Sequence, residues 1–399
     1  MMRECKMMKN KINFYDGFIQ DDVIWFSNLN HNALMTLNLK NGQLSSIARF
    51  PGCESYQNNL HIRVIENNGK LYFVPRNGNF VHAFSLEKMI FEENISLPYL
   101  DNNNIANAII DKCGRIWIIP AYFKKGIVIL NTNDKSAERF NKTDLLHIAE
   151  DAFIGPNCVS YNKGVISICI FKSNVLIHID TSSEEIKYEE LDARYKPYSF
   201  ISRDGVIFYF SNYPDNKILS WNKNEKKYTV IFDGADCEAA MYMYWNYIQK
   251  GNEILCIPCD NNDLSIVDIY HNKKKHIRLN QIVKRNSCNA LYSFYREYKG
   301  QIYLFPSGAD GLLIINCDDW SIDRLNYVIS DDLREQIQAE YDKNFRNEML
   351  SGIVSETIAY DESLDEFLNY VTENKICEDL DDKPDCGDEI YERTKRIIS

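Results

Sequence analysis

The sequence lacks any long hydrophobic run. Its 399 residues contain no apolar stretch of about 18 residues, the length needed for a transmembrane helix. The first residues, MMRECKMMKNKINFYDGF, are partly basic but lack the apolar segment of a secretory signal. We therefore expect a cytoplasmic protein with no membrane partner, in which the twelve cysteines are reduced and partly buried thiols.

The sequence also lacks an excess of basic residues. Its net charge is −12, and residues 351–399 alone contain 14 Asp and Glu against 5 Lys and Arg. The rest of the chain is therefore nearly neutral. Binding to nucleic acid needs a basic surface, so this charge distribution argues against nucleic acid as the main partner.

Catalytic and metal-binding motifs are missing too. There is no serine-centred elbow, no phosphate-binding glycine loop and no H-E-x-x-H motif. The seven histidines show no metal-ligand spacing, and we expect His178 to be a hydrogen-bonded core residue. Cys256 and Cys259 have C-x-x-C spacing, but residues three apart in a strand point to opposite faces. The sequence predicts no catalytic residue, no metal and no cofactor.

What the sequence does contain is a repeat. A short apolar run recurs about every 46 residues, a spacing close to the length of a four-stranded propeller blade. The first apolar anchor residues of the seven runs are Ile24, Leu71, Ile116, Ile166, Ile207, Ile254 and Ile302.

Each run has the same surroundings. A turn that usually contains glycine, such as NNG at 67–69 or RDG at 203–205, comes before it. A second alternating run follows and ends in a small polar residue, which favours a turn by bonding to its own backbone. These polar residues are Asn38, Ser85, Asn131, Asp180, Asn222, Asp268 and Asn316.

Each unit therefore predicts four short antiparallel strands, named A to D here. Strands B and C are apolar on both faces, so a single sheet could not hide them, whereas sheets stacked around an axis could. Proline ends strand B in four units, where a missing N–H is tolerated. We predict an all-β protein with a seven-bladed β-propeller over residues 12–328. A β-solenoid or two stacked sandwiches are the alternative folds.

The repeat array resembles the β-propeller superfamily over about four-fifths of the chain. It lacks the recurrent Trp-Asp ending of WD40 blades, the paired glycines of kelch blades and any YWTD run. The resemblance implies the fold and no particular activity, because propellers include both binding proteins and enzymes.

The blade geometry indicates which face binds. The A–B turns are short, whereas the B–C and D–A loops on the other face are long and rich in Tyr and Asn, which suit reversible recognition. The ligand-binding residues predicted on this face are Tyr56, Asn58, Asn104, Asn107, Asn157, Tyr198, Glu238, Tyr242, Asn289 and Tyr292. The alternative is that these asparagines form turns and the tyrosines pack between blades.

Two functions follow from these observations. The preferred one is a monomeric, non-catalytic scaffold that recognises a protein, peptide or glycan on the loop-rich face. The alternative is a propeller enzyme, a lyase or hydrolase, that uses loop carboxylates at the channel mouth, with or without a divalent metal. The carboxylates available on this face are Glu54, Asp236, Glu238, Asp260, Asp263 and Asp310.

The last part of the chain, residues 329–399, has a different pattern. Leu333, Ile337, Tyr341 and Phe345 form an apolar helical stripe that follows Ser330, a suitable helix cap. Further helices are predicted over 363–376 and 389–398, around an acidic and mobile segment at 377–389. The extension is predicted either to pack on the propeller edge or to dock a partner.

Overall fold

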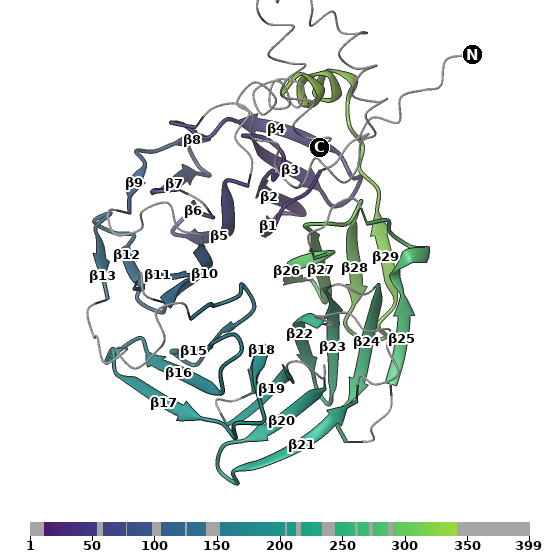
Figure 1. Cartoon of the computed structure of the whole chain (residues 1–399). Helices are drawn as coiled ribbons and strands as arrows, with labels where there is room; N and C mark the ends of the chain where they lie inside the picture. The colour runs from purple at the N-terminus through teal and green to yellow at the C-terminus, as the bar shows by residue number, and fades with distance from the viewer. Residues whose placement is uncertain are drawn as a thin grey trace, which may run out of the picture. The chain divides into compact units, whose positions relative to one another are not determined.

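The computed structural model describes residues 12–53, 59–76, 78–97, 105–123, 126–140, 152–203, 206–212, 217–233, 244–259, 262–270, 274–285 and 290–340. In this part of the chain, seven antiparallel sheets follow one another around a ring (Figure 1). Each sheet is one blade and consists of strands consecutive in sequence. The prediction of a seven-bladed β-propeller is therefore confirmed.

The strands of each blade run in chain order from the centre of the ring outwards (Figure 1). Blades 1 to 3 contain β1 (Gly17–Gln20), β2 (Val23–Ser27), β3 (Leu34–Asn38), β4 (Leu44–Ala48); β5 (His61–Asn67), β6 (Lys70–Pro75), β7 (Phe80–Ser85), β8 (Ile90–Phe91), β9 (Ile95–Ser96); and β10 (Ile105–Ile110), β11 (Arg115–Pro120), β12 (Val128–Asn131), β13 (Ala137–Arg139). Blades 4 and 5 contain β14 (Val159–Asn162), β15 (Val165–Cys169), β16 (Val175–Asp180), β17 (Ile186–Glu190); and β18 (Pro197–Arg203), β19 (Ile207–Asn212), β20 (Ile218–Asn222), β21 (Lys227–Phe232). Blades 6 and 7 contain β22 (Tyr244–Lys250), β23 (Glu253–Pro258), β24 (Asp263–Asp268), β25 (Lys274–Arg278), the short 3-10 helix η4 (Leu279–Gln281); and β26 (Tyr292–Tyr298), β27 (Gln301–Pro306), β28 (Leu312–Asn316), β29 (Ile322–Leu325).

The predicted turns set the strand boundaries. Between β5 and β6, Asn68 and Gly69 have φ values of 52° and 74°, the left-handed conformation that a two-residue hairpin turn requires. At the end of strand C, the side chain of Asn38 accepts the backbone N–H of Lys40 at 2.9 Å. Asn131, Asp180, Asn222, Asp268 and Asn316 accept the N–H two residues on in the same way. These side chains form the turns that the sequence predicts.

The hydrophobic core lies between neighbouring blades. The middle strands are buried on both faces, and every residue of β11 after Arg115 is buried. Trp117 and Phe208 are examples, with exposed fractions of 0% and 1%. Full burial of a large apolar side chain contributes about 1.5–3 kcal/mol, so each blade depends on its neighbours for stability. This is the physical reason for the ring.

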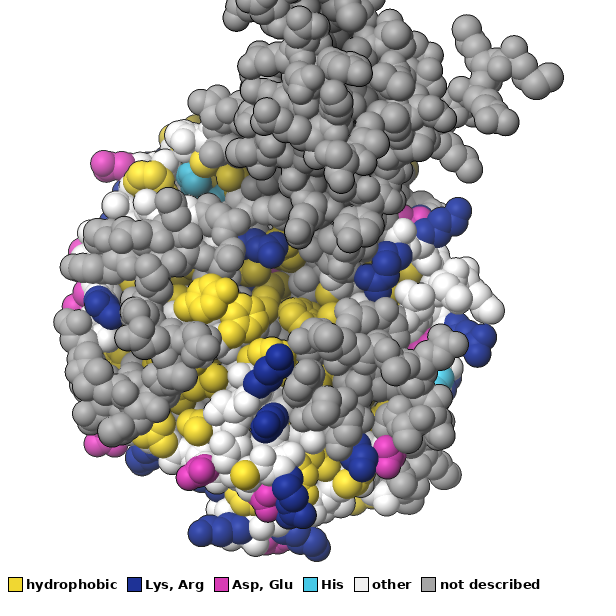
Figure 2. Space-filling model, in the orientation of Figure 1, with side chains coloured by type: hydrophobic (Ala, Val, Ile, Leu, Met, Phe, Trp, Pro, Cys, Tyr) yellow, Lys and Arg dark blue, Asp and Glu magenta, His cyan; other side chains and the backbone are white. Residues whose placement is uncertain are grey.

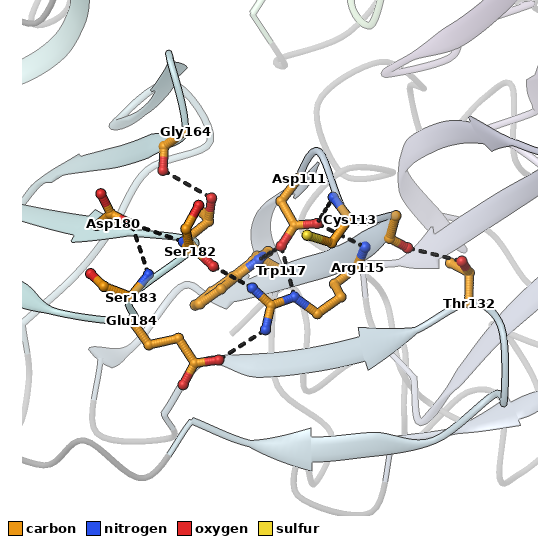
Figure 3. A network of polar contacts seen from close by, with 12 residues as sticks. Asp111, Cys113, Arg115, Trp117, Thr132, Gly164, Asp180, Ser182, Ser183 and Glu184 are labelled. Carbon is orange, nitrogen blue, oxygen red and sulfur yellow. Dashed lines mark hydrogen bonds and ion pairs between the residues drawn. The ribbon is translucent and has the colours of Figure 1, made fainter.

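Polar contacts also join adjacent blades (Figure 3). Arg115 of blade 3 contacts the carboxylate of Asp111 in its own blade at 2.8 Å. The same guanidinium reaches blade 4, where it bonds to the carboxylate of Glu184 at 2.8 Å and to the carbonyl of Thr181. The indole N–H of Trp117 donates to Asp111 at 2.9 Å. Arg115 therefore clamps the inner hairpin of blade 3 to the outer hairpin of blade 4.

Two chain segments close the ring between blades 7 and 1. Before β1, the N–H of Phe14 donates to the carbonyl of Pro306 in blade 7 at 2.9 Å. After β29, Val328 lies parallel to Gln43, donating to Gly42 at 2.8 Å and accepting from Leu44 at 3.0 Å. Each flanking segment is thus fastened to the blade at the other end of the array.

A helix at residues 331–340 follows this second segment. The hydroxyl of Ser330 accepts the N–H of Leu333 at 3.3 Å, as predicted for a helix cap. Leu333 and Ile337 pack against the hydrophobic core, and Glu340 forms an ion pair with Arg49 of blade 1. The described residues contain no helix long and apolar enough to cross a membrane. Tyr341, Phe345 and the later predicted helices lie outside the described residues.

Candidate functional site

A cavity of about 720 Å³ occupies the centre of the ring. All seven innermost strands, or the residues just before them, contribute to its lining. The polar and charged lining residues are Arg63, Glu66, Asn107, Asn157, Ser160, Tyr161, Asn162, Ser202, Asn246, Tyr247, Tyr295, Arg296 and Glu297. Its volume falls within the range of about 300–1,000 Å³ typical of small-molecule sites.

One position of the repeat lies at or just before the start of the innermost strand in every blade, and in four blades its residue lines the cavity. In six blades it stands eight residues before the apolar anchor, and in blade 3 it stands nine residues before. The residues at this position are Asp16, Arg63, Asn107, Cys158, Ser199, Asn246 and Phe294. In five blades the strand register shifts here, as in a β-bulge, which redirects the side chain at this position.

In four blades the side chain at this position donates to a backbone carbonyl of the next blade. Ser199 of blade 5, for example, donates its hydroxyl proton to the carbonyl of Trp245 in blade 6 at 2.8 Å. Equivalent bonds run from Asn107 to the Pro156 carbonyl at 2.6 Å, from the Cys158 thiol to the Tyr198 carbonyl at 3.0 Å, and from Asn246 to the Ser293 carbonyl at 3.3 Å. These bonds thus join adjacent blades, and two of the four residues, Asn107 and Asn246, also line the cavity.

The charged members of the site come from blades 1, 2 and 7. Asp16, whose side chain is fully buried, accepts hydrogen bonds from Arg296 at 2.8 Å and from the N–H of Val64 at 3.0 Å. Arg63 lies 3.4 Å from the same carboxylate oxygen and stacks on the ring of Phe294 at 4.2 Å. Burial lowers the pKa of Arg63 to about 10, against the opposing effect of Asp16, so Arg63 stays charged at neutral pH. Two guanidinium groups therefore share one carboxylate.

Several polar atoms along the cavity are buried without a hydrogen-bond partner. They are Arg63 Nε, Asn157 Nδ2, Tyr161 Oη and Ser202 Oγ. A buried donor left unpaired costs about 1–3 kcal/mol, so such atoms are rare unless water or a ligand satisfies them. Four of the nine such atoms among the described residues belong to residues that line this cavity.

The ten residues predicted for binding fall into three groups. Asn107 and Asn157 line the cavity. Tyr198 and Tyr292 are buried, with 3% and 0% exposure, and belong to the innermost strands β18 and β26 where the sequence suggested loops. Tyr56, Asn58, Asn104, Glu238, Tyr242 and Asn289 lie outside the described residues. Their role in binding stays a prediction.

The sequence reasoning missed Asp16, Arg63, Asn246 and Arg296. A signal for the first three was present, because each stands eight residues before its anchor. This position falls at the start of the innermost strand, in a stretch that resembles a loop in composition. Arg296 had no repeat signal. Its contact with Asp16 joins residues 280 positions apart and follows only from closure of the ring.

Loop carboxylates, the basis of the enzyme alternative, are only partly described. Asp310 forms an ion pair with Arg324 at 3.3 Å and accepts the N–H of Lys284 at 2.8 Å. Glu54, Asp236 and Asp260 lie outside the described residues. Within the described ranges, no three His, Cys, Asp or Glu side chains form a metal-binding group.

Blade 4 contains a serine, a histidine and a glutamate in hydrogen-bonded order. Ser167 bonds to His178 Nδ1 at 2.8 Å, and His178 Nε2 lies 3.3 Å from Glu189. Ser167 and His178 are only 5% and 7% exposed, and His178 packs against the ring of Phe208. A substrate could not reach this serine. The prediction that His178 is a hydrogen-bonded core residue is confirmed.

Side-chain types are unevenly distributed over the face drawn in Figure 2. Hydrophobic side chains gather around the middle of this face together with several Lys and Arg side chains, whereas most visible Asp and Glu side chains lie towards the rim (Figure 2). This distribution suits a ligand with apolar and anionic parts.

No protein-family model matches the chain, and no curated protein matches its sequence. Solved structures do match. A catalytically inactive virginiamycin B lyase from Staphylococcus aureus with quinupristin is 13% identical and covers 76% of this chain and 95% of its own, with a TM-score of 0.57. A streptogramin B lyase is 15% identical over 79% of this chain and 96% of its own, with a TM-score of 0.57. YCF48 bound to D1 peptide is 10% identical over 77% and 94%, with a TM-score of 0.58. At these identities the similarity shows the propeller fold alone.

Proposed function

We propose that this protein is a recognition module that binds a peptide or a peptide-like small molecule in its central channel. The observation that carries the proposal is the cavity of about 720 Å³ with its unpaired polar atoms. Apolar residues such as Phe18, Phe200 and Ile201 line the same cavity. A rigid site of this mixed character suits a peptide, which offers both backbone polar groups and apolar side chains.

The structural neighbours support this class of ligand. One is a propeller bound to a peptide, and another is a propeller crystallised with quinupristin. The enzyme alternative has less support among the described residues, because Asp310 is already ion-paired and the serine–histidine pair of blade 4 is closed to substrates.

A cavity-filling variant tests the proposal. Ser160 lines the cavity and is half-buried, so Ser160→Tyr should occupy the space that a ligand needs. Ser45, exposed on the outer strand β4, provides the matched control Ser45→Tyr. Peptides selected from a random pentapeptide library on the wild-type protein are then titrated against both variants by calorimetry.

We expect binding to survive in Ser45→Tyr and to weaken at least about tenfold in Ser160→Tyr, which is the scale of about 1.4 kcal/mol. The melting temperature of each variant shows that it is folded. Equal affinity for wild type and folded Ser160→Tyr would place the peptide elsewhere on the protein. A library that yields no binder above background would remove the proposed function.

A further inference from the structure

We propose that Ser27, His61 and His82 form an acid-sensitive latch, which fastens blade 2 to blade 1 and to the segment that links the two blades. The latch is closed while both imidazoles are neutral, and uptake of a proton opens it. The three residues lie outside the lining of the central cavity, so the inference does not depend on the proposed function.

The latch consists of three hydrogen bonds in series. Ser27 Oγ, at the end of β2 in blade 1, lies 2.8 Å from Nδ1 of His61, the first residue of β5 in blade 2. Nε2 of His61 lies 2.9 Å from Nδ1 of His82 in β7. Nε2 of His82 lies 3.1 Å from the carbonyl oxygen of Pro51, in the segment between β4 and β5. The series therefore joins blade 1, blade 2 and the segment between them.

The carbonyl at the end of the series fixes the direction of all three bonds. A carbonyl oxygen can only accept, so Nε2 of His82 carries the proton, and Nδ1 of the neutral ring is an acceptor. His61 Nε2 is therefore the donor to His82, and His61 Nδ1 accepts the hydroxyl proton of Ser27. The thiol of Cys53 lies 3.9 Å from His82 Nε2, a longer contact than the bond to the carbonyl. Two neutral imidazoles thus satisfy every ring nitrogen of the pair.

An added proton has no suitable place in this arrangement. On Nδ1 of His82 it would face the N–H of His61, so that two donors would meet. On Nδ1 of His61 it would reverse the bond with Ser27 and leave a cation in the protein interior. Burial of an unpaired charge is costly, so either product favours an opened interface in which water reaches the rings.

The rings around the pair are apolar. His61 and His82 are 3% and 4% exposed. The ring of Phe50 lies 4.2 Å from that of His61 and 5.3 Å from that of His82. Phe73 of β6 lies 5.6 Å from His61, and Phe91 of β8 lies 6.3 Å from His82. These aromatic side chains exclude water from the closed latch.

The described residues also supply no counter-charge to the pair. The thiol of Cys53 is the one other titratable group that they bring to the two rings, and it is neutral at physiological pH because burial raises its pKa. Glu54, the next residue, lies outside the described residues. Burial lowers the pKa of His61, with His82 as the second cause. Burial also lowers the pKa of His82, against the opposing effect of its bond to the Pro51 carbonyl.

The direction of the pH effect follows from these shifts. Histidines in an opened interface have a pKa near 6.5, so they take up protons that the closed pair does not. Opening therefore becomes more favourable as the pH falls below about 6.5. Each histidine contributes up to about a tenfold change in the opening equilibrium per pH unit.

Hydrogen–deuterium exchange of backbone amides at pH 7.0 and 5.0, corrected for the intrinsic exchange rate, tests the latch. The reporter is the peptide over 59–67, because the N–H of Asn59 donates to the Leu29 carbonyl of blade 1 at 2.7 Å. The internal control is the peptide over β22 in blade 6. We expect protection over 59–67 to fall at least about tenfold more than protection over β22.

His61→Gln and His82→Gln replace a titrating ring by an amide that can still donate and accept hydrogen bonds. The matched control is His276→Gln, because His276 Nδ1 also bonds to a serine, Ser265, at 2.8 Å, but His276 is exposed. We expect the fall in protection over 59–67 to shrink several-fold in each single variant and to disappear in the double variant. His276→Gln should keep the wild-type response. Circular dichroism at pH 7.0 shows whether each variant is folded.

NMR of wild type labelled with 15N-histidine provides a second measurement that needs no variant. We expect the rings of His61 and His82 to be protonated at Nε2 alone, and to keep that state as the pH is lowered through 6.5. Titration of either ring at or above pH 6.5 in the folded protein would overturn the inference. An equal change in protection over 59–67 and β22 would overturn it too, as would a wild-type response in the folded double variant.

Discussion

Removal of Arg296 should weaken closure of the ring more than removal of any exposed ion pair. Arg296 donates to Asp16 at 2.8 Å, to the carbonyl of Gly17 at 3.0 Å and to that of Val64 at 2.9 Å, so one side chain joins blades 7, 1 and 2. Because the Asp16 side chain is fully buried, Arg296→Met leaves its carboxylate with the 3.4 Å contact from Arg63 and the N–H of Val64 at 3.0 Å. Breaking a buried pair in this way costs about 3–5 kcal/mol.

That cost converts to a measurable shift. The folded unit spans about 335 residues, 10–344, and at about 2.1 cal/mol/K per residue a loss of about 4 kcal/mol lowers the melting temperature by about 6 °C. Calorimetry and urea unfolding of Arg296→Met, Asp16→Asn and the double variant give the coupling. The double variant should be more stable than the sum of the single losses implies, because both single changes break the same contact.

The exposed pair Lys299–Asp22, at 2.6 Å, joins blades 7 and 1 and serves as the control. Lys299→Met should change stability far less, since water and salt screen exposed charges. A loss below about 1 kcal/mol in Arg296→Met, a loss no greater than that of Lys299→Met, or strict additivity in the double variant would refute the reasoning.

Three further changes have definite expected outcomes. Tyr161→Phe removes a buried hydroxyl without a partner, so the free energy of unfolding should stay equal or rise; a fall above about 1 kcal/mol in urea unfolding would show that the hydroxyl is satisfied. Burial opposes ionisation of Glu189, but hydrogen bonds from His178, Lys223 and Trp221 outweigh it and lower its pKa from 4.5 to about 2. Wild type should therefore lose stability as the pH falls from about 4.5 to about 2, and Glu189→Gln should flatten this region of the unfolding curve. Burial lowers the pKa of His31 from 6.5 to about 4, against the effect of Glu340, so the unfolded chain binds the extra proton in this range. The stability of wild type should therefore decrease as the pH is lowered from about 6.5 to about 4, and it should decrease less in His31→Gln. Melting temperatures in matched buffers measure both.

Local signals were sufficient to predict the blades. The glycine turns, the strand-ending prolines and the polar residues that close strand C depend on nearby backbone geometry, and β3 begins and ends as its pattern predicts. The outer strand of blade 2 had no such signal. It is divided into β8 and β9, which pair with different ends of β7, because residues 92–94 interrupt it.

The site was harder to predict because it depends on distant parts of the chain. The contacts of Asp16 with Arg63 and Arg296 join three blades, and no local pattern states that blade 7 returns to blade 1. Asn107 and Asn157 were singled out as members of loops, and the structure places them at the cavity for a different reason. They belong to the start of the innermost strands or stand immediately before them, where side chains turn towards the centre.

The segment before β1 is bonded to the last blade and the segment after β29 to the first, which bears on how the ring responds to a pulling force. The segment that enters the ring is bonded to blade 7 through Phe14, and the segment that leaves it is bonded to blade 1 through Val328. Tension on the two flanking segments therefore loads the Phe14 bond to blade 7 and the Val328 bond to blade 1 at the same time. We therefore expect the hydrogen bonds of Phe14 and Val328 to break under tension before any blade unfolds.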